Sequence, residues 1–142
     1  MPMTKKQKAD LLQHVELFSN LTARALGLIA DQMLEATFTA GQHIVRQGQV
    51  GTGFYVIVQG RVKVVRGPDI LARLGPNEFF GELSVLDQEP RMAHVVAEEA
   101  TTCLALASWD FTKLLEDNPK ITLSMLRVMA RRLRNAATQP HH

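Results

Sequence analysis

The spacing of apolar residues changes twice along the chain, and these changes divide it into three parts. Residues 5–17 and 22–33 both place apolar side chains at helical spacing, the second with Leu26, Ile29, Ala30 and Met33 on one face. Thr22 is suited to cap the second helix, because its hydroxyl can accept a hydrogen bond from a free amide of the first turn. Two helices are therefore predicted within the first 33 residues.

Between residues 34 and 107 short β-branched runs alternate with glycines, a pattern typical of consecutive antiparallel strands. Gly60-Arg61 separates two apolar runs and predicts a tight hairpin, and residues 66–69 predict the next turn. The last two runs, 93–98 and 101–107, are expected to close the structure. The middle of the chain is therefore predicted to be an all-β core.

Two further helices are predicted after the strands. Ser108 is a candidate cap for a helix that runs through Leu115 and stops at Asn118, and Pro119 suits the first position of another that ends near Ala136. The last helix carries a broad apolar arc, made of Ile121, Met125, Leu126, Val128, Met129 and Leu133. This arc is wider than packing on one partner requires.

Length and composition fit one globular domain over residues 1–142, with 46% hydrophobic and 21% charged residues. The net charge of +2 is too small to predict direct nucleic-acid binding. Cys103 is the only cysteine, which excludes a disulfide within one chain and fits a reducing compartment. Since neither a membrane-spanning run nor the apolar core of a signal peptide is found, a cytoplasmic location without direct membrane contact is predicted.

The stretch from Phe79 to Ala97 carries the most specific chemistry. Gly81 leads into residues 82–86, which are predicted to form one helical turn, and Arg91 follows on the next loop. Free amides at a helix start and a nearby guanidinium are suited to bind a phosphate. Glu82 would repel an anion unless it accepted a hydrogen bond, for which a sugar hydroxyl is the obvious donor. These residues together predict a site for a ribose phosphate.

The same stretch resembles the phosphate-binding cassette of cyclic nucleotide-binding domains, through Gly81-Glu82-Leu83-Ser84, Pro90-Arg91-Met92-Ala93 and Val95. The family pattern extends from Leu11 to about Leu133. It implies a mainly β fold, an antiparallel double-stranded, jelly-roll-like β-roll at 34–107 with the cassette at 79–97, N-terminal helices at 1–33 and C-terminal helices at 108–137. The resemblance also implies a set of ligand-binding residues, namely Gly81, Glu82, Leu83, Ser84, Arg91, Met92 and Ala93.

The ligand implied by the resemblance is cAMP, with cGMP as the alternative. Family members that prefer cGMP bond the guanine amino group with a threonine or serine, and Met92 stands at that position. The last helix of the family covers the base as a lid and is a candidate to pair with its copy in a homodimer. Base contacts are expected from Arg131, Arg132 or Arg134, of which Arg134 is preferred, with Val64 and Leu71 as further candidates.

His94 departs from the family pattern, which has a small polar residue there, and we expect it to face solvent rather than the phosphate. Two other functions stay open. One is a roll with an unoccupied pocket that serves only protein–protein contact or dimerisation, which Gly81, Glu82 and Arg91 disfavour. The other is a metal-dependent cupin enzyme, which the lack of any His-x-His pair disfavours. The prediction is therefore a binding module without catalysis, metal or cofactor.

Overall fold

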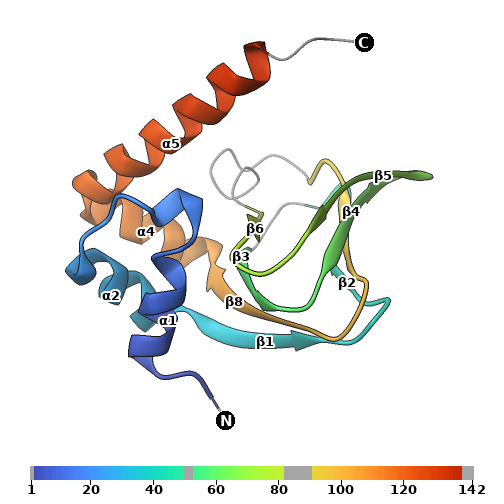
Figure 1. Ribbon diagram of the computed structural model, residues 1–142, viewed down its shortest axis with the longest axis horizontal. Coiled ribbons are helices and arrows are strands. Elements are labelled where there is room, and N and C mark those ends of the chain that lie inside the picture. Colours follow the sequence, from blue (N-terminus) through green and yellow to red (C-terminus); the bar gives the residue numbers. More distant parts are fainter. Residues whose placement is uncertain (1, 50–52, 82–90, 139–142) are drawn as a thin grey trace.

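The computed structural model describes residues 2–49, 53–81 and 91–138, and it places a group of helices at one end of a roll of strands (Figure 1). The helices are α1 (Lys5–Leu12), the 3-10 helix η1 (Glu16–Phe18), α2 (Ala23–Gln32), α4 (Ser108–Asp117) and α5 (Pro119–Thr138). The strands are β1 (Leu34–Phe38), β2 (His43–Val45), β3 (Gly53–Gln59), β4 (Val62–Arg66), β5 (Asp69–Leu74), β6 (Phe79–Phe80), β7 (His94–Ala97) and β8 (Thr101–Ala107).

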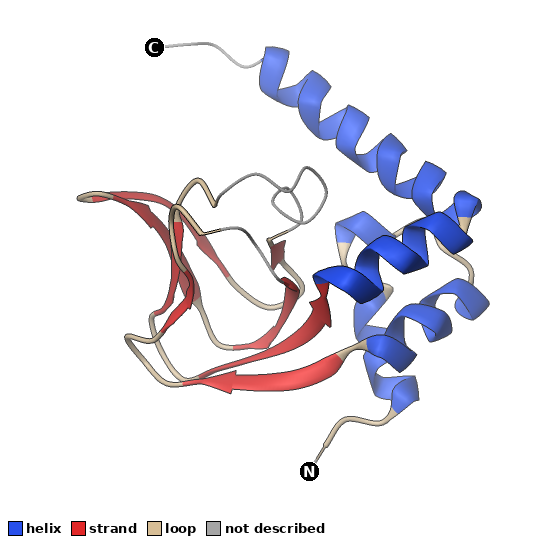
Figure 2. Cartoon of the chain, turned by 180° about the vertical axis from the view of Figure 1, so that it is seen from behind, coloured by secondary structure: helices blue, strands red, loops and turns tan. Residues whose placement is uncertain are grey.

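The strands form two antiparallel sheets of four, with the orders β1-β8-β3-β6 and β2-β7-β4-β5. β7 lies between β2 and β4, and β8 lies between β1 and β3, so the last two strands complete both sheets as expected. The predicted β-roll with flanking helices is confirmed. Figure 2 shows the same arrangement from behind, with α5 leading away from the other helices.

The buried side chains form two clusters that differ in position. The larger one joins the helices to the first sheet, and its largest members include Phe18, Phe54 and Phe111. Phe54 packs against both of the others, with ring centroids 5.9 Å from Phe18 and 5.1 Å from Phe111. The smaller cluster fills the roll between the two sheets and consists of Val45, Ile57, Val62, Phe80, Val95 and Cys103. The helices are thus packed on one side of the first sheet, and the roll has an interior of its own.

Gly60-Arg61 is not the hairpin turn that the sequence predicts. β3 and β4, which it joins, lie in different sheets, so these two residues carry the chain across a corner of the roll. A glycine between two apolar runs gives the same pattern for a hairpin and for such a corner. The hairpin predicted at 66–69 is confirmed, because Arg66 pairs with Asp69 across Gly67, which has φ +59°.

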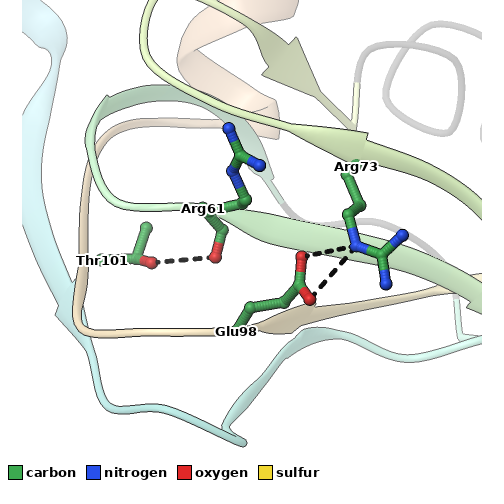
Figure 3. A network of polar contacts seen from close by, with 4 residues as sticks. All are labelled: Arg61, Arg73, Glu98 and Thr101. Atoms are coloured by element: carbon green, nitrogen blue, oxygen red, sulfur yellow. Dashed lines mark hydrogen bonds and ion pairs between the residues drawn. The ribbon is translucent and has the colours of Figure 1, made fainter.

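The corner is fixed by the turn between β7 and β8 (Figure 3). The Arg61 carbonyl accepts hydrogen bonds from the Glu98 amide at 2.9 Å and from the Thr101 hydroxyl at 3.3 Å. Nε of Arg73, on β5, lies 3.2 Å from Oε1 of the Glu98 carboxylate. The two sheets are therefore linked at this corner by backbone and side-chain contacts together.

The first predicted helix, over residues 5–17, ends earlier than expected, at Leu12. Leu12, Val15, Leu17 and Phe18 are all buried. On a straight helix these four positions would occupy more than half of the circumference, so one face could not bury them all. The helix instead ends at Leu12, and the chain continues into η1. The predicted cap of α2 is confirmed, since the Thr22 hydroxyl accepts from the Ala25 amide at 3.2 Å.

The two C-terminal helices lie close to their predicted positions, but Ser108 is not the cap of α4. Ser108 is the first residue of the helix, and Ala107 takes the cap position without a side-chain hydrogen bond, because β8 runs directly into α4. Asn118 ends α4 as expected, with its side-chain amide donating to the Leu114 carbonyl over 2.9 Å. Pro119 begins α5, which continues to Thr138 rather than to Ala136.

Candidate functional site

Arg91 is a buried cation between the two sheets, with 8% of its surface exposed. Its Nη2 donates a hydrogen bond of 2.8 Å to the carbonyl of Gly53, at the start of β3. Its backbone is held as well, since the Arg91 amide donates to the Gln49 carbonyl over 2.7 Å. Arg91 is therefore held both at its guanidinium and at its backbone amide. A site that binds one anionic group in one orientation requires an arginine fixed in this way.

Gly81 lies directly against the Arg91 guanidinium. It has φ +96°, a conformation in which side chains other than glycine are strained. A Cβ at this position would stand 2.8 Å from Nη1 of Arg91 and 2.7 Å from the Gly53 carbonyl oxygen. Gly81 thus serves a second purpose beyond its backbone angle, because it leaves the space that the buried guanidinium occupies.

Tyr55 and Gly53 belong to this site although the sequence did not single them out. The Tyr55 ring stacks on Phe80 with a centroid distance of 5.1 Å. Burial raises the pKa of the Tyr55 hydroxyl, and the charge of Arg91 opposes that shift. Tyr55 is the only tyrosine of the chain and lies within an apolar strand, which was the available signal. Gly53 contributes a backbone carbonyl, for which a sequence carries no signal.

The other residues of the predicted cassette differ in whether the structure describes them and in how exposed they are. Glu82, Leu83 and Ser84 lie outside the described residues. Met92 follows Arg91 with 67% of its surface exposed, and Ala93 is buried. Of the predicted cassette, the structure therefore brings Gly81 and Arg91 together.

The predicted base contacts are spread over three elements. Val64 on β4 packs against the cluster inside the roll, whereas Leu71 on β5 has 48% of its surface exposed. Arg131 and Arg134 are exposed on α5. Val64 is the one of these four that faces the interior of the roll.

Arg132 is the α5 arginine that reaches the roll. Its Nε lies 2.7 Å from Oε1 of Glu16, in η1, and its guanidinium carbon lies 4.4 Å from the ring centroid of Phe79. Phe79 is on β6, two residues before Gly81. Arg132 therefore connects the second half of α5 with the strand that leads into the cassette.

His94 lies on the outer side of the roll. Side chains alternate along a strand, and its neighbour Val95 points into the interior cluster. The half-buried His94 ring contacts the ring of His43 edge-on, with centroids 5.2 Å apart, and its Nδ1 accepts a hydrogen bond from the Gln47 amide. Among the described residues no group of three His, Cys, Asp or Glu side chains is arranged to hold a metal.

Three further features lie away from Arg91. Burial raises the pKa of the Cys103 thiol, inside the roll, to about 12. A groove of about 820 Å³ runs between the start of α2 and the start of α5, and Leu28 and Leu123 line it. None of the helices in the described ranges has the length and apolar character that crossing a membrane needs.

Residues 35–118 match the cyclic nucleotide-binding domain family. The chain belongs to this family. It is 33% identical over 135 residues to the CRP-like cAMP-activated global transcriptional regulator of Mycobacterium tuberculosis, a match that covers 88% of the chain and 58% of the relative. The chain thus spans less than two thirds of that curated relative.

Two solved structures are similar to the domain. The N-terminal domain of a transcriptional regulator from Streptomyces coelicolor has 34% identity and a TM-score of 0.80, with 92% of this chain and 96% of the other covered. The regulatory domain of Toxoplasma gondii PKA, solved with cAMP, has 25% identity and a TM-score of 0.79, with 92% and 50% covered. Both similarities extend over most of the cyclic nucleotide-binding domain described here.

Proposed function

We propose that this domain binds cAMP inside the β-roll, with the cyclic phosphate held at Gly81 and Arg91, and that it acts as a regulatory sensor rather than as an enzyme. The observation that carries the proposal is the buried Arg91 guanidinium, packed against a glycine that no other residue can replace without a clash. A guanidinium fixed in one orientation is suited to bind a phosphate through charge-assisted hydrogen bonds. The cyclic phosphate is the anionic group that the proposal assigns to it.

The rest of the predicted cassette completes this proposal. The amides of residues 82–84 are assigned to the phosphate and the Glu82 carboxylate to the ribose hydroxyl, on the resemblance of the motif. Val64 packs against the cluster inside the roll, which supports its assignment as a base contact. The fit of Gly81 to the Arg91 guanidinium disfavours the alternative of a roll that serves only protein contact.

The choice of cAMP over cGMP rests on Met92. A thioether offers the guanine amino group no acceptor comparable to a hydroxyl. Two of the similar proteins support the same choice, one being a cAMP-activated regulator and the other a kinase regulatory domain solved with cAMP.

The proposed output is a movement of α5. Its first half is part of the large core cluster through Ile121, Met125 and Val128, so the proposed movement is assigned to the second half. Its second half is attached to the roll through Arg132, which contacts Glu16 and Phe79. Because Phe79 leads into Gly81, a ligand that shifts the cassette also shifts this attachment. Coupling is therefore proposed between the nucleotide and the part of α5 that follows Val128.

The decisive experiment is Arg91→Ala with cAMP titrated by calorimetry. Removing one partner of a partly buried charge pair costs about 2–5 kcal/mol. We therefore expect affinity to fall roughly thirtyfold to several thousandfold. The matched control is Arg66→Ala, which removes an exposed arginine at the end of β4. A folded Arg91→Ala variant that binds cAMP like the parent would contradict the proposed function.

A further inference from the structure

A turn that follows β2 is fastened to the chain segment that carries Arg91 by three hydrogen bonds. The Gly48 amide donates to the Arg91 carbonyl over 2.9 Å, and the Arg91 amide donates to the Gln49 carbonyl over 2.7 Å. The third bond involves a side chain, because the Gln47 amide donates to Nδ1 of His94 over 3.1 Å. The backbone of the buried arginine is therefore held by a turn that a histidine fixes from outside the roll.

The turn itself is well defined. The Gln49 amide donates to the Arg46 carbonyl over 3.3 Å, and Gly48 has φ +85°, as the third residue of a type II turn requires. This hydrogen bond closes the turn around Gln47 and Gly48. Loss of the anchor at Gln47 is therefore expected to weaken the two bonds that hold Arg91.

The anchor depends on the protonation of His94. A neutral imidazole with its proton on Nε2 accepts a hydrogen bond at Nδ1, whereas an imidazolium carries protons on both nitrogens and accepts none. The bond from the Gln47 amide therefore requires the neutral ring. Protonation replaces an attractive contact with two opposed N–H groups.

The surroundings of His94 add to this effect. His43 touches His94 edge-on, and the positive charges of Arg46 and Lys63 act on His43. Desolvation first, and then the charges of Arg46, His94 and Lys63, lower the pKa of the exposed His43 imidazole below its ordinary value of 6.5. The folded protein therefore favours the neutral form of His43. The stability that this contributes is fully present above pH 6.5 and is lost as the pH falls through the lowered pKa of His43. Acid therefore opposes the contact between the two rings.

We propose that His94 is a positioning residue for Arg91: while neutral it anchors the turn that holds the arginine backbone, and when protonated it releases that turn and weakens cyclic nucleotide binding. The second part of this proposal, the weakening of cyclic nucleotide binding, rests on the proposed function. The anchoring of the turn can be measured without any ligand. Failure of one half is therefore distinguishable from failure of the other.

The ligand-free measurement is amide hydrogen exchange by NMR, expressed as protection factors for Gln47 and Arg91 at about pH 7.5 and about pH 5.5. In the parent both amides should be protected at the higher pH and lose protection at the lower. His94→Ala should lack protection at both. His94→Asn places an oxygen acceptor near the position of Nδ1 and cannot titrate, so it should restore protection at both. Equal protection in the parent and in His94→Ala would overturn the anchor.

The binding measurement is cAMP affinity by calorimetry at the same two pH values. One hydrogen bond corresponds to about fivefold in affinity, so the parent should bind about fivefold more weakly at the lower pH, and His94→Ala about fivefold more weakly at both. His94→Asn should bind independently of pH. The control His14→Asn removes an exposed histidine between α1 and η1 and should keep the parent's pH dependence.

Each outcome decides one claim. An anchor that responds to pH together with a cAMP affinity that does not would show that His94 does not position Arg91. A parent that binds no cyclic nucleotide would refute the proposed function. In that case the protection factor of the Arg91 amide still tests whether His94 holds the arginine in place.

Discussion

Arg91 and Gly81 depend on each other at the scale of single residues. The arginine needs a compensating environment because it is buried, and the glycine needs to lack a side chain because the guanidinium takes its place. Either residue alone has an ordinary explanation, as a salt-bridging cation or as a turn glycine. Their contact is what makes the pair a candidate site. A substitution of either Gly81 or Arg91 is therefore expected to disrupt the candidate site even when the other residue is unchanged.

Met92→Thr tests the choice of nucleotide. The parent should bind cAMP about tenfold more tightly than cGMP, which corresponds to one good hydrogen bond to the guanine amino group that Met92 does not make. The threonine hydroxyl supplies that bond, so the variant should narrow the gap. The measurement is competition of both nucleotides against a fluorescent analogue. Met92 is exposed, so the substitution should leave stability unchanged. Equal affinities in the parent would remove the reason for choosing cAMP.

The contact between Gly81 and Arg91 could be anticipated at this scale, since both residues are recognisable from their spacing and residue types. Gly53 could not, because it acts through a backbone carbonyl that any residue possesses. The role of Arg132 could not be separated from that of Arg131 and Arg134 either. All three are arginines on one helix, and their difference comes from the direction of the helix relative to Phe79 and Glu16.

At the scale of elements, some helix limits follow from local patterns, but the early end of α1 at Leu12 and the connections between strands do not. Thr22 caps α2 and Pro119 starts α5 because capping chemistry is local. The prediction of a hairpin at Gly60-Arg61 is wrong, because the residues that fix this connection, Glu98 and Thr101, are remote in sequence. A short turn signal gives no information about which sheet the chain enters next.

Gly60→Ala tests the corner between the two sheets. Gly60 has φ +102°, and an added Cβ would lie 2.5 Å from the Thr101 hydroxyl and 2.6 Å from the Ala100 carbonyl oxygen. Backbone strain and overpacking together should lower the free energy of unfolding by about 3 kcal/mol. Gly41→Ala is the matched control, because φ there is +87° and nothing lies within 4 Å of the added Cβ. It should lose only about 1–2 kcal/mol. Urea denaturation measures both, and equal losses would show that the corner is not tightly packed.

Hydrogen exchange with mass spectrometry tests the coupling of α5. Amides up to Val128 should be protected with and without ligand, because Ile121, Met125 and Val128 are in the core. Amides after Val128 should exchange fast in the free protein and slowly with saturating cAMP. Arg132→Ala removes the contacts to Glu16 and Phe79 and should reduce this difference, with Arg131→Ala as the control on the same helix. Identical exchange of the second half in both states would contradict the coupling even if binding is confirmed.

At the scale of the whole molecule, α5 has an apolar surface that none of the other residues described in the structure covers. Leu123, Leu126, Ala130, Leu133 and Ala137 are all exposed and follow one another at alternating intervals of three and four residues. This spacing is the seam of a two-stranded coiled coil. α5 has 20 residues and is therefore about 30 Å long, enough for a continuous seam. The face that packs on the core, with Met125 and Val128, is a different one, so core packing and pairing do not compete for the same residues.

We therefore expect two copies of the chain to associate through this seam as a twofold dimer. Leu126 and Leu133 have 60% and 73% of their surfaces exposed, so replacing either by glutamate should leave the monomer folded while placing like charges across the seam. Sedimentation equilibrium should show a dimer for the parent and a monomer for Leu126→Glu or Leu133→Glu. Arg131→Glu introduces the same side chain on α5 but off the seam, and it should remain dimeric. A parent that is monomeric at high concentration would contradict the pairing. A dimer that persists in both leucine variants would move the interface to another surface, for which the groove beside Leu28 is the next place to test.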